Sequence, residues 1–464
     1  MFLTSYENII SSPVIFLHFS AVCCIILPEK IFTKVFTTNI CSCIIEIGGE
    51  KVERTIFHID ANSAFLSWSA VKLLNEWPPI DLRSVPSVVG GSEQSRKGIV
   101  LASSIPAKQL GIKTGETLYS ARLKCPELIV VPPDFELYED MSAKFFKICN
   151  SFSPLVQKFS IDELFLDYTN MEPHFGPPLE GAKKISEKIK SELGFTVNIG
   201  ISTNKLLAKM ASDFEKPDKI HTLYPDEIKE KMWPLPIGNL FMVGRQTKKK
   251  LLDIGIDTIG KLANCDIEIM KKYLKSHGEL IHKYANGIDA SLVTTEKEPY
   301  KSISNGSTLP RDISDKGELL KYALSLCEKV CSRLRKEGVS ASVVDVGIRF
   351  KDLSYCSHQK KLLKYIYSTN DVYSAVKDLV NELWSGETPV RAITIGLSDL
   401  VSNEYQQCSF FDDDKSIKYE KIEGIVDELR EIYGFHCITR ASLVDDKFHK
   451  NVLKHQNPSM KSYL

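Results

Sequence analysis

The sequence lacks the cysteine pattern of a zinc site or a disulfide framework. Its 12 cysteines are scattered over 464 residues, and no two of them form a CxxC pair. Cys327 and Cys331 lie one helical turn apart, but neither has a Cys or His partner at zinc-ligand spacing. We therefore expect free thiols in a reducing cytoplasm, and we expect no structural zinc.

The sequence also lacks a long membrane-spanning run. The apolar stretch 14–27 is shorter than the roughly 20 residues that a membrane helix needs. It has no basic segment before it and no clear small-residue cleavage site, so it fits a signal peptide poorly. A weak membrane anchor is one interpretation. We favour the other, in which residues 1–51 are an extension outside the working protein and no stable membrane association exists.

Net charge is absent as well, because Lys and Arg balance Asp and Glu at 59 each. The charges are unevenly spread, however. Residues 301–365 hold 13 Lys and Arg against 7 Asp and Glu, whereas residues 399–431 hold 4 against 10. A basic surface for a polyanion can therefore coexist with an acidic tail, although a basic surplus of this size also serves solubility alone.

Two adjacent carboxylates, Asp162 and Glu163, interrupt an apolar, β-prone run. Neighbouring side chains of a regular strand point to opposite faces, so both acids can serve one site only if the backbone turns there. Clustered carboxylate oxygens suit a hard cation such as Mg²⁺. The plain alternative is a hairpin tip whose acids face water.

A third acid, Asp60, ends the apolar run that starts at Thr55, and a helix capped by Asn62 or Ser63 follows it. The subsequent order of strands and helices predicts a split βαβ sheet with helices on one face. On such a sheet the end of the first strand lies beside the central hairpin. The order therefore predicts that Asp60, Asp162 and Glu163 come together.

Basic and glycine-rich segments surround this predicted sheet. Residues 78–124 contain several glycines and lysines and predict a small irregular insert. Further along, Gly244 opens a helix containing Lys248 and Lys249, and a second short helix begins near Thr258. This is typical of a helix-hairpin-helix that binds DNA phosphates through amide N–H groups and lysines, or of a plain αα-hairpin with solvated lysines.

The C-terminal part repeats a similar order of elements. After a polar connector the chain alternates strand, helix, two strands, helix and strand between Ser302 and Leu397, which predicts a second α+β module. A helix and a short extended piece follow in residues 425–443, without an assignable role.

At this point the sequence resembles the Y family of translesion DNA polymerases, on the side of bacterial polymerase IV and the polymerase V catalytic subunit. The resemblance runs from about Val52 to Leu400 and rests on motifs in a fixed order. These motifs are Ile59-Asp60-Ala61-Asn62-Ser63-Ala64-Phe65, Ser160-Ile161-Asp162-Glu163, Gly200-Ile201-Ser202-Thr203-Asn204-Lys205 with Ala208-Lys209, and Val243-Gly244.

The resemblance implies an α+β right-hand polymerase with a ferredoxin-like palm, small fingers, a helical thumb with a helix-hairpin-helix, and a separate α+β little finger. The implied divisions are an atypical extension (1–51), palm (52–72 and 125–225), fingers (73–124), thumb (226–293), linker (294–301), little finger (302–400) and acidic tail (401–464).

The family also implies a two-metal site. Asp60, Asp162 and Glu163 become the expected catalytic acids, and together with the Ala61 carbonyl they become the expected ligands of two Mg²⁺ ions. Such ions stabilise the attacking and leaving oxygens of a phosphoryl transfer. Some relatives have an acid at the position of Asn62, a difference that leaves activity in place.

Three further residues are implied to contact the incoming nucleotide. Lys209 matches the palm lysine of the family, and Phe65 matches the bulky residue that excludes ribonucleotides. In the fingers, many relatives have a Tyr and an Arg where this chain has Ile105 and Lys108. Lys108 keeps the charge without the bidentate geometry of Arg, so we expect it to bind phosphate and expect no such role for Ile105.

Beyond the polymerase-like region, Gln407-Cys408-Ser409-Phe410-Phe411 resembles the short peptide by which such proteins dock on the bacterial sliding clamp, with Gln407, Phe410 and Phe411 as anchors. Local packing is the alternative. The resemblance implies a cytoplasmic polymerase that uses primer-template DNA and deoxynucleoside triphosphates. The competing interpretation is a non-catalytic DNA-binding or clamp-adaptor protein of the same fold.

Overall fold

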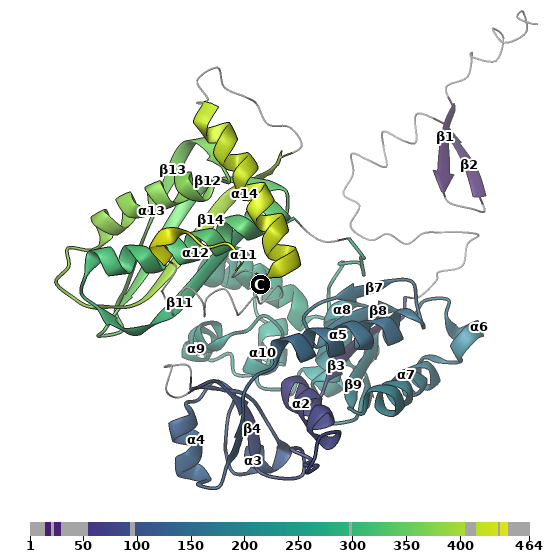
Figure 1. Cartoon of the computed structure of the whole chain (residues 1–464). Helices are drawn as coiled ribbons and strands as arrows, with labels where there is room; N and C mark the ends of the chain where they lie inside the picture. Colours follow the sequence, from purple (N-terminus) through teal and green to yellow (C-terminus); the bar gives the residue numbers. More distant parts are fainter. Residues whose placement is uncertain are drawn as a thin grey trace, which may run out of the picture. The chain divides into compact units, whose positions relative to one another are not determined.

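The computed structural model (Figure 1) contains two compact units, each built from two parts of the chain. The first unit comprises Met1–Asn62 with Phe145–Thr295, and the second comprises Ser63–Lys144 with Glu296–Leu464. The residues that the structure describes are 54–92, 98–296, 299–403, 414–434 and 437–443, together with strands β1 (Val14–Phe19) and β2 (Cys23–Pro28), which form an antiparallel pair. Within the described residues, no helix is both long and apolar enough to cross a membrane.

A five-stranded sheet forms the centre of the first unit. Its middle strand β3 (Ile56–Ala61) is antiparallel to β8 (Glu163–Asp167) on one side and to β9 (Val197–Ser202) on the other. The outer strands are β7 (Val156–Lys158) beside β8 and β10 (Ile220–Thr222) parallel to β9. The order β9-β3-β8-β7 is the ferredoxin-like arrangement that the sequence predicts, extended by β10.

Helices and short turns complete this unit, and α5 runs across the boundary between the two units. They are α5 (Phe135–Asn150), α6 (Glu172–Phe175), α7 (Pro178–Leu193), α8 (Lys205–Ser212), η1 (Pro225–Glu227), η2 (Ile228–Met232), η3 (Ile237–Asn239), α9 (Arg245–Asp253), α10 (Ile259–Ala263) and α11 (Ile267–Ala285).

Helices cover both faces of the sheet, so the prediction of helices on one face was wrong. On one face Phe57 stacks on Tyr168, whose ring lies against Gly181 of α7. The neighbouring residue His58 points to the opposite face, where its ring contacts Ser212 of α8. The order of elements along the chain does not specify which face of the sheet α8 covers.

A glycine lets α8 approach this face closely. A Cβ atom at Gly200 of β9 would lie 1.9 Å from the Ala208 carbonyl oxygen of α8. Any larger residue at this position would push the helix away from the sheet. The close approach matters because α8 carries Lys209 and Ser212 toward β3, the strand that contains Asp60.

A small three-stranded sheet lies in the second unit. Its order is β5 (Val100–Ser103), β4 (Ser87–Gly90), β6 (Ile129–Val131), and the helices α2 (Ala64–Leu74), α3 (Ile105–Gln109) and α4 (Leu118–Lys124) accompany it. The palm implied by the resemblance resumes at residue 125, so residues 128–131 were expected in the five-stranded sheet, and this expectation was wrong. β6 pairs in parallel with β4 instead.

The C-terminal module contains a four-stranded antiparallel sheet. Along the chain its elements are β11 (Ser302–Ile313), α12 (Lys316–Lys336), β12 (Val339–Phe350), β13 (Tyr355–Ile366), α13 (Thr369–Leu383) and β14 (Val390–Ser402). This succession matches the sequence prediction. The order across the sheet is β11-β14-β12-β13, so the last strand lies inside the sheet and the arrangement differs from that of the first unit.

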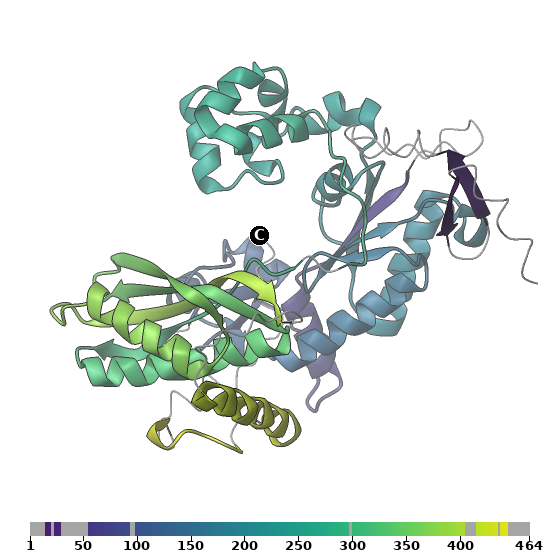
Figure 2. The ribbon, with the colours of Figure 1, turned by 90° about the horizontal axis from the view of Figure 1, so that it is seen from above.

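Two more elements follow β14. They are α14 (Asp414–Tyr433) and the short turn η5 (Ala441–Leu443). Figure 2 shows α14 lying along the helices of the C-terminal module, away from its sheet. The helix predicted around residues 425–430 is therefore present and longer than expected.

Candidate functional site

The three acids predicted to come together do so at one end of the five-stranded sheet. Asp60 on β3 lies directly across the strand pair from Glu163, the first residue of β8. Asp162 precedes Glu163, and its carbonyl oxygen accepts the Ala61 N–H at 2.9 Å. Ala61 is thus fixed beside the acids through its backbone. The turn required by the sequence argument is present, because β7 and β8 form a hairpin in which Glu163 accepts backbone N–H groups from Phe159 and Ser160.

Glu163 is held ionised by two cationic or polar neighbours. Its carboxylate accepts hydrogen bonds from Lys209 Nζ at 2.9 Å and from His58 Nε2 at 3.2 Å. Burial alone would raise the pKa of Glu163, but the hydrogen bond from His58 and the charge of Lys209 outweigh it and lower the pKa to about 2. Glu163 therefore remains an anion at any physiological pH.

His58 orients the Glu163 carboxylate through this hydrogen bond. Its side chain is fully buried, and burial lowers its pKa, so the ring is neutral. A carboxylate can only accept, hence Nε2 carries the proton that it donates to Glu163. Nδ1 then accepts the hydroxyl of Ser212 at 2.7 Å. This chain of contacts links the predicted hairpin to α8.

Asp60 is paired with a lysine that the sequence analysis did not single out. Lys216, in the loop after α8, bonds both Asp60 and Asp213, the latter at 2.8 Å. Burial raises the pKa of Asp60, and the charge of Lys216 partly offsets this rise. For Lys216, burial lowers the pKa, but Asp60 and Asp213 together raise it above its usual value. Lys216 thus provides a fixed positive charge beside the acids.

These carboxylates fit a divalent metal by their chemistry. Asp60 and Glu163 each hold an ammonium group, which shows that their oxygens bind cations in this position. No cationic side chain of the described residues pairs with Asp162, and burial together with the charges of Asp60 and Glu163 raises its pKa to about 6 although Ser160 donates a hydrogen bond to it. Among the described residues, no three His, Cys, Asp or Glu side chains already converge on a single metal position.

We expect Asp162→Asn to stabilise the metal-free protein near neutral pH. Because the pKa of Asp162 is raised to about 6 in the folded protein, its carboxyl is protonated below about pH 4 in both folded and unfolded states and costs no stability there. As pH rises through 6 the buried carboxyl ionises, and the free energy of unfolding falls. Asn has no charge to bury, so it should add about 1–3 kcal/mol at pH 7.5 and little near pH 4. Thermal unfolding with a chelator, across this pH range, measures the difference. Asp167→Asn, at the other end of β8, is the control; an equal gain there would contradict the explanation.

Two predicted nucleotide contacts lie in the second unit. Phe65 on α2 is half-buried and stacks on Tyr138, with ring centroids 4.4 Å apart, while Phe135 meets its edge at 6.2 Å. The ring is therefore held in one orientation. Lys108 near the end of α3 donates to the Ser63 hydroxyl at 2.8 Å, at the start of the same helix α2. Lys108 is thus tied to the N-cap of α2, and Phe65 lies in the first turn of the same helix.

The two helices predicted after Gly244 and near Thr258 are present in the first unit as α9 and α10. Gly244 is the N-cap of α9 without a side-chain cap, and a Cβ atom there would meet nothing within 4 Å. The first amide N–H groups of α9 lie at an open helix end, which favours an anion. Lys248 and Lys249 are exposed on α9. The peptide with Gln407, Phe410 and Phe411 lies outside the described residues.

Sequence reasoning missed His58 and Lys216. A signal existed for His58, because it precedes Asp60 by two residues in a strand and so shares its face. Lys216 gave no such signal, since its place beside Asp60 depends on the path of the loop after α8.

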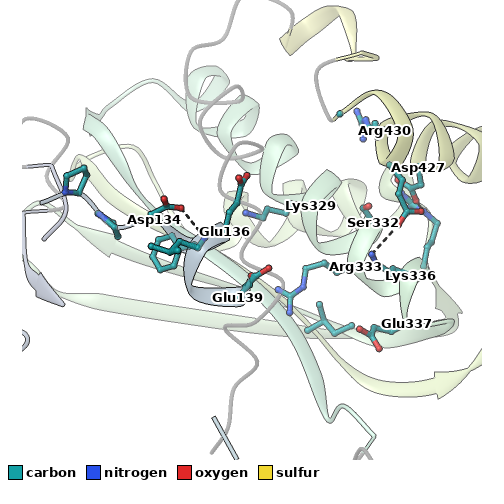
Figure 3. Close-up of a pocket in the computed structure, with 18 of the residues that line it drawn as sticks. Asp134, Glu136, Glu139, Lys329, Ser332, Arg333, Lys336, Glu337, Asp427 and Arg430 are labelled. Carbon is teal, nitrogen blue, oxygen red and sulfur yellow. Dashed lines mark hydrogen bonds and ion pairs between the residues drawn. The ribbon is translucent and has the colours of Figure 1, made fainter. Parts of the chain in front are cut away.

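A cavity of about 1230 Å³ lies in the second unit and does not contain the acids. Charged residues of α5 line one side, and residues of α12 and α14 line the other (Figure 3). Arg333, Lys336 and Glu337 face it together with Glu136 and Glu139. A lining of mixed charge is typical of a solvent-filled gap between elements. The candidate catalytic residues are instead the acids of the first unit.

Comparison with known families gives two matches along the chain. The model of the impB/mucB/samB family matches residues 59–213, and the model of the C-terminal domain of that family matches residues 300–410. The first match contains all three acids, and the second covers the whole of the four-stranded module.

Curated relatives and solved structures agree with these matches. DNA polymerase IV of Clostridium acetobutylicum is 47% identical over 394 residues, which is 85% of this chain and 99% of that protein. DNA polymerase IV 1 of Bacillus subtilis is 37% identical over 392 residues, 84% of this chain and 93% of that protein. A solved Y-family DNA polymerase chimera superposes with a TM-score of 0.66 at 26% identity, covering 75% of this chain and all of the other.

Proposed function

Because the chain belongs to the Y family of DNA polymerases, we propose that the acids of its five-stranded sheet are the catalytic centre of a DNA-directed DNA polymerase. The enzyme carries out translesion DNA synthesis, adding deoxynucleotides to a primer end opposite a template. The observation that supports the site is the convergence of Asp60, Asp162 and Glu163 at one sheet edge. Primer extension tests it: the wild type should incorporate deoxynucleotides and Asp162→Ala should not.

We assign the domains as the family implies. The five-stranded sheet belongs to the palm (52–72 and 125–225), the small sheet to the fingers (73–124) and α9–α11 to the thumb (226–293). After the linker (294–301), the four-stranded module is the little finger (302–400), with the tail at 401–464. β6 pairs with the small sheet, so the residues around 129–131 join the fingers structurally.

Two Mg²⁺ ions would be held by Asp60, Asp162, Glu163 and the Ala61 carbonyl. When bound, such ions stabilise the developing charge on the attacking and leaving oxygens of nucleotidyl transfer. The chain's own residues do the positioning. Glu163 is oriented by His58 and kept ionised, and the lowered pKa ensures that its oxygens are free of protons. The adaptor alternative has no support in this arrangement, since all three acids are in place.

The cationic side chains of the site suit the triphosphate of the incoming nucleotide. Lys209 and Lys216 lie against the acids in the first unit, and Lys108 is anchored at the start of α2. Each lysine donates to an oxygen acceptor, a place that a phosphate oxygen of the nucleotide would take. We assign phosphate binding to all three, and we assign exclusion of the 2′-hydroxyl to Phe65.

We expect Lys216→Gln to raise the KM for deoxynucleotides about 10-fold, because one charge-assisted phosphate contact contributes roughly 1–2 kcal/mol. The change in kcat should be smaller. Steady-state single-nucleotide insertion measures both constants. Lys219→Gln is the matched control, since Lys219 pairs with Glu215 at 3.8 Å on the surface. Equal KM values for the Lys216 variant and the wild type would exclude the phosphate contact.

We assign DNA backbone binding to the start of α9. The open N-terminus at Gly244, with Lys248 and Lys249 nearby, offers amide N–H groups and positive charge to phosphates. We also propose that Gln407, Phe410 and Phe411 dock on the sliding clamp, as the resemblance implies. Since the template is chromosomal DNA, we place this activity in the cytoplasm.

A further inference from the structure

The helix α14 packs on the C-terminal module with Glu423 and Arg430 inward and three isoleucines outward, while Val426 and Leu429 are half-buried. Glu423 and Arg430 are 8% and 5% exposed, whereas Ile422, Ile425 and Ile432 are 53%, 57% and 72% exposed. A surface helix of a globular protein ordinarily buries its apolar stripe. The most buried side chains of α14 are therefore charged rather than apolar.

Ion pairs with α12 hold α14 in place. Arg335 of α12 donates to Glu423 at 2.9 Å and to Asp427 at 2.6 Å. One face of α12 thus meets one face of α14, and Glu328, two helical turns before Arg335, pairs with Arg430 at 3.4 Å. Figure 3 shows Asp427 and Arg430 on α14 beside α12.

Two further contacts extend this network. Glu423 accepts the backbone N–H of Thr369 at 3.0 Å, at the N-terminus of α13, where the helix dipole favours an anion. Arg440, just before η5, bonds Glu328 at 2.8 Å and Glu423 at 3.2 Å. Leu443 in η5 is fully buried and is the apolar end of the segment.

The hydrophobic core of the module closes without α14. That core consists of buried residues from β11 to β14 with α12 and α13, and none of the described α14 residues belongs to it. Loss of α14 would therefore expose polar surface of α12 and leave the core packed. Removing one partner of a buried ion pair, by contrast, leaves the other charge buried and unpaired, which strongly destabilises the contact.

We propose that α14 and η5 form a charge-latched strap, which attaches to and leaves the C-terminal module as one unit while the module stays folded. When attached, the strap holds the C-terminal end of the preceding segment near the module, which affects how readily that segment binds a partner. That segment lies between Ser402, the end of β14, and Asp414, the start of α14, and it includes residues 407–411. This part of the proposal rests on the clamp docking proposed above. A peptide fixed at both ends loses less freedom on binding than a free tail.

Hydrogen exchange of the full-length protein tests the strap. In Glu423→Gln, which keeps the side-chain size and removes the charge shared by Arg335 and Arg440, amide protection in residues 421–434 should fall about 30-fold or more. Protection in α12 and β14 should stay within about twofold. Glu431→Gln is the matched control on the same helix, because its pair with Lys336 at 3.4 Å is exposed. Asp427→Asn, at a less buried position, serves if Glu423→Gln does not fold.

Other results would overturn the proposal. Equal loss of protection in α12 and α14 would make α14 part of the core, and unchanged protection would show that the ion pairs do not hold it. Binding to purified bacterial sliding clamp tests presentation: Glu423→Gln should bind about 3–10-fold more weakly, and unchanged affinity would refute this role. If the wild type itself does not bind the clamp, clamp docking fails, while hydrogen exchange still decides the strap.

Discussion

Asp162→Ala should reduce primer extension by about 10³-fold or more, because loss of a metal-binding carboxylate removes several kcal/mol of transition-state stabilisation. Asp162 lies in the turn between β7 and β8, beside Asp60 and Glu163, and among these three acids it is the one without a lysine partner in the described part of the chain. The measurement is single-nucleotide incorporation on an undamaged primed template with Mg²⁺. Binding to the primed template should persist and weaken with salt, since phosphate contacts lie elsewhere.

Asp167→Asn provides the matched control for this variant. Asp167 ends the same strand, where its carboxylate accepts the Thr169 N–H at 3.0 Å, and Asn retains that acceptor. Its activity should remain near that of the wild type. Residual activity of Asp162→Ala at the wild-type level would contradict the three-acid site. If wild type and variant both bind primed DNA and neither incorporates nucleotide, the adaptor interpretation is correct.

Phe65→Ala should admit ribonucleotides, with discrimination against the 2′-hydroxyl falling about 100-fold, because a steric clash of one hydroxyl costs roughly 1–3 kcal/mol. The ring is available for this role since the stack on Tyr138 fixes its orientation and leaves it only half-buried. The ratio of kcat/KM for deoxyribonucleotide and ribonucleotide measures the effect.

Phe65→Tyr should retain discrimination, because the bulk of the ring remains. Phe65→Ala also removes packing against Trp68 and Phe135, so thermal unfolding must be measured alongside to separate lost stability from altered sugar selection. Unchanged discrimination in a folded Phe65→Ala protein would remove the steric role.

Local patterns in the sequence predicted most of the elements near the site. The run ending at Asp60 forms β3, the Asp162-Glu163 pair lies at the hairpin, and the helix predicted after Asp60 forms α2 with Ser63 as its N-cap. These predictions succeeded because a strand's alternation, a turn and a cap are each specified by residues close together in the chain. The prediction of α14 around residues 425–430 has the same basis.

Predictions that depended on distant partners fared worse. Residues 129–131 have the composition of a central strand, but they pair with β4, because an apolar run does not specify which sheet will receive it. Likewise, the strand and helix order of the C-terminal module does not reveal that β14 lies between β11 and β12. Strand neighbours are chosen by packing of the whole module.

By itself the sequence determined which acids are present, that they fall at strand ends and a turn, and to which family the chain belongs. Tertiary structure alone decided which cations meet those acids. Gly200 lets α8 lie close to the sheet, so Lys209 reaches Glu163 and Ser212 reaches His58, and the loop beyond α8 brings Lys216 onto Asp60. The physical reason is that charge pairing acts over a few ångströms, and only the packed helix and sheet set those separations.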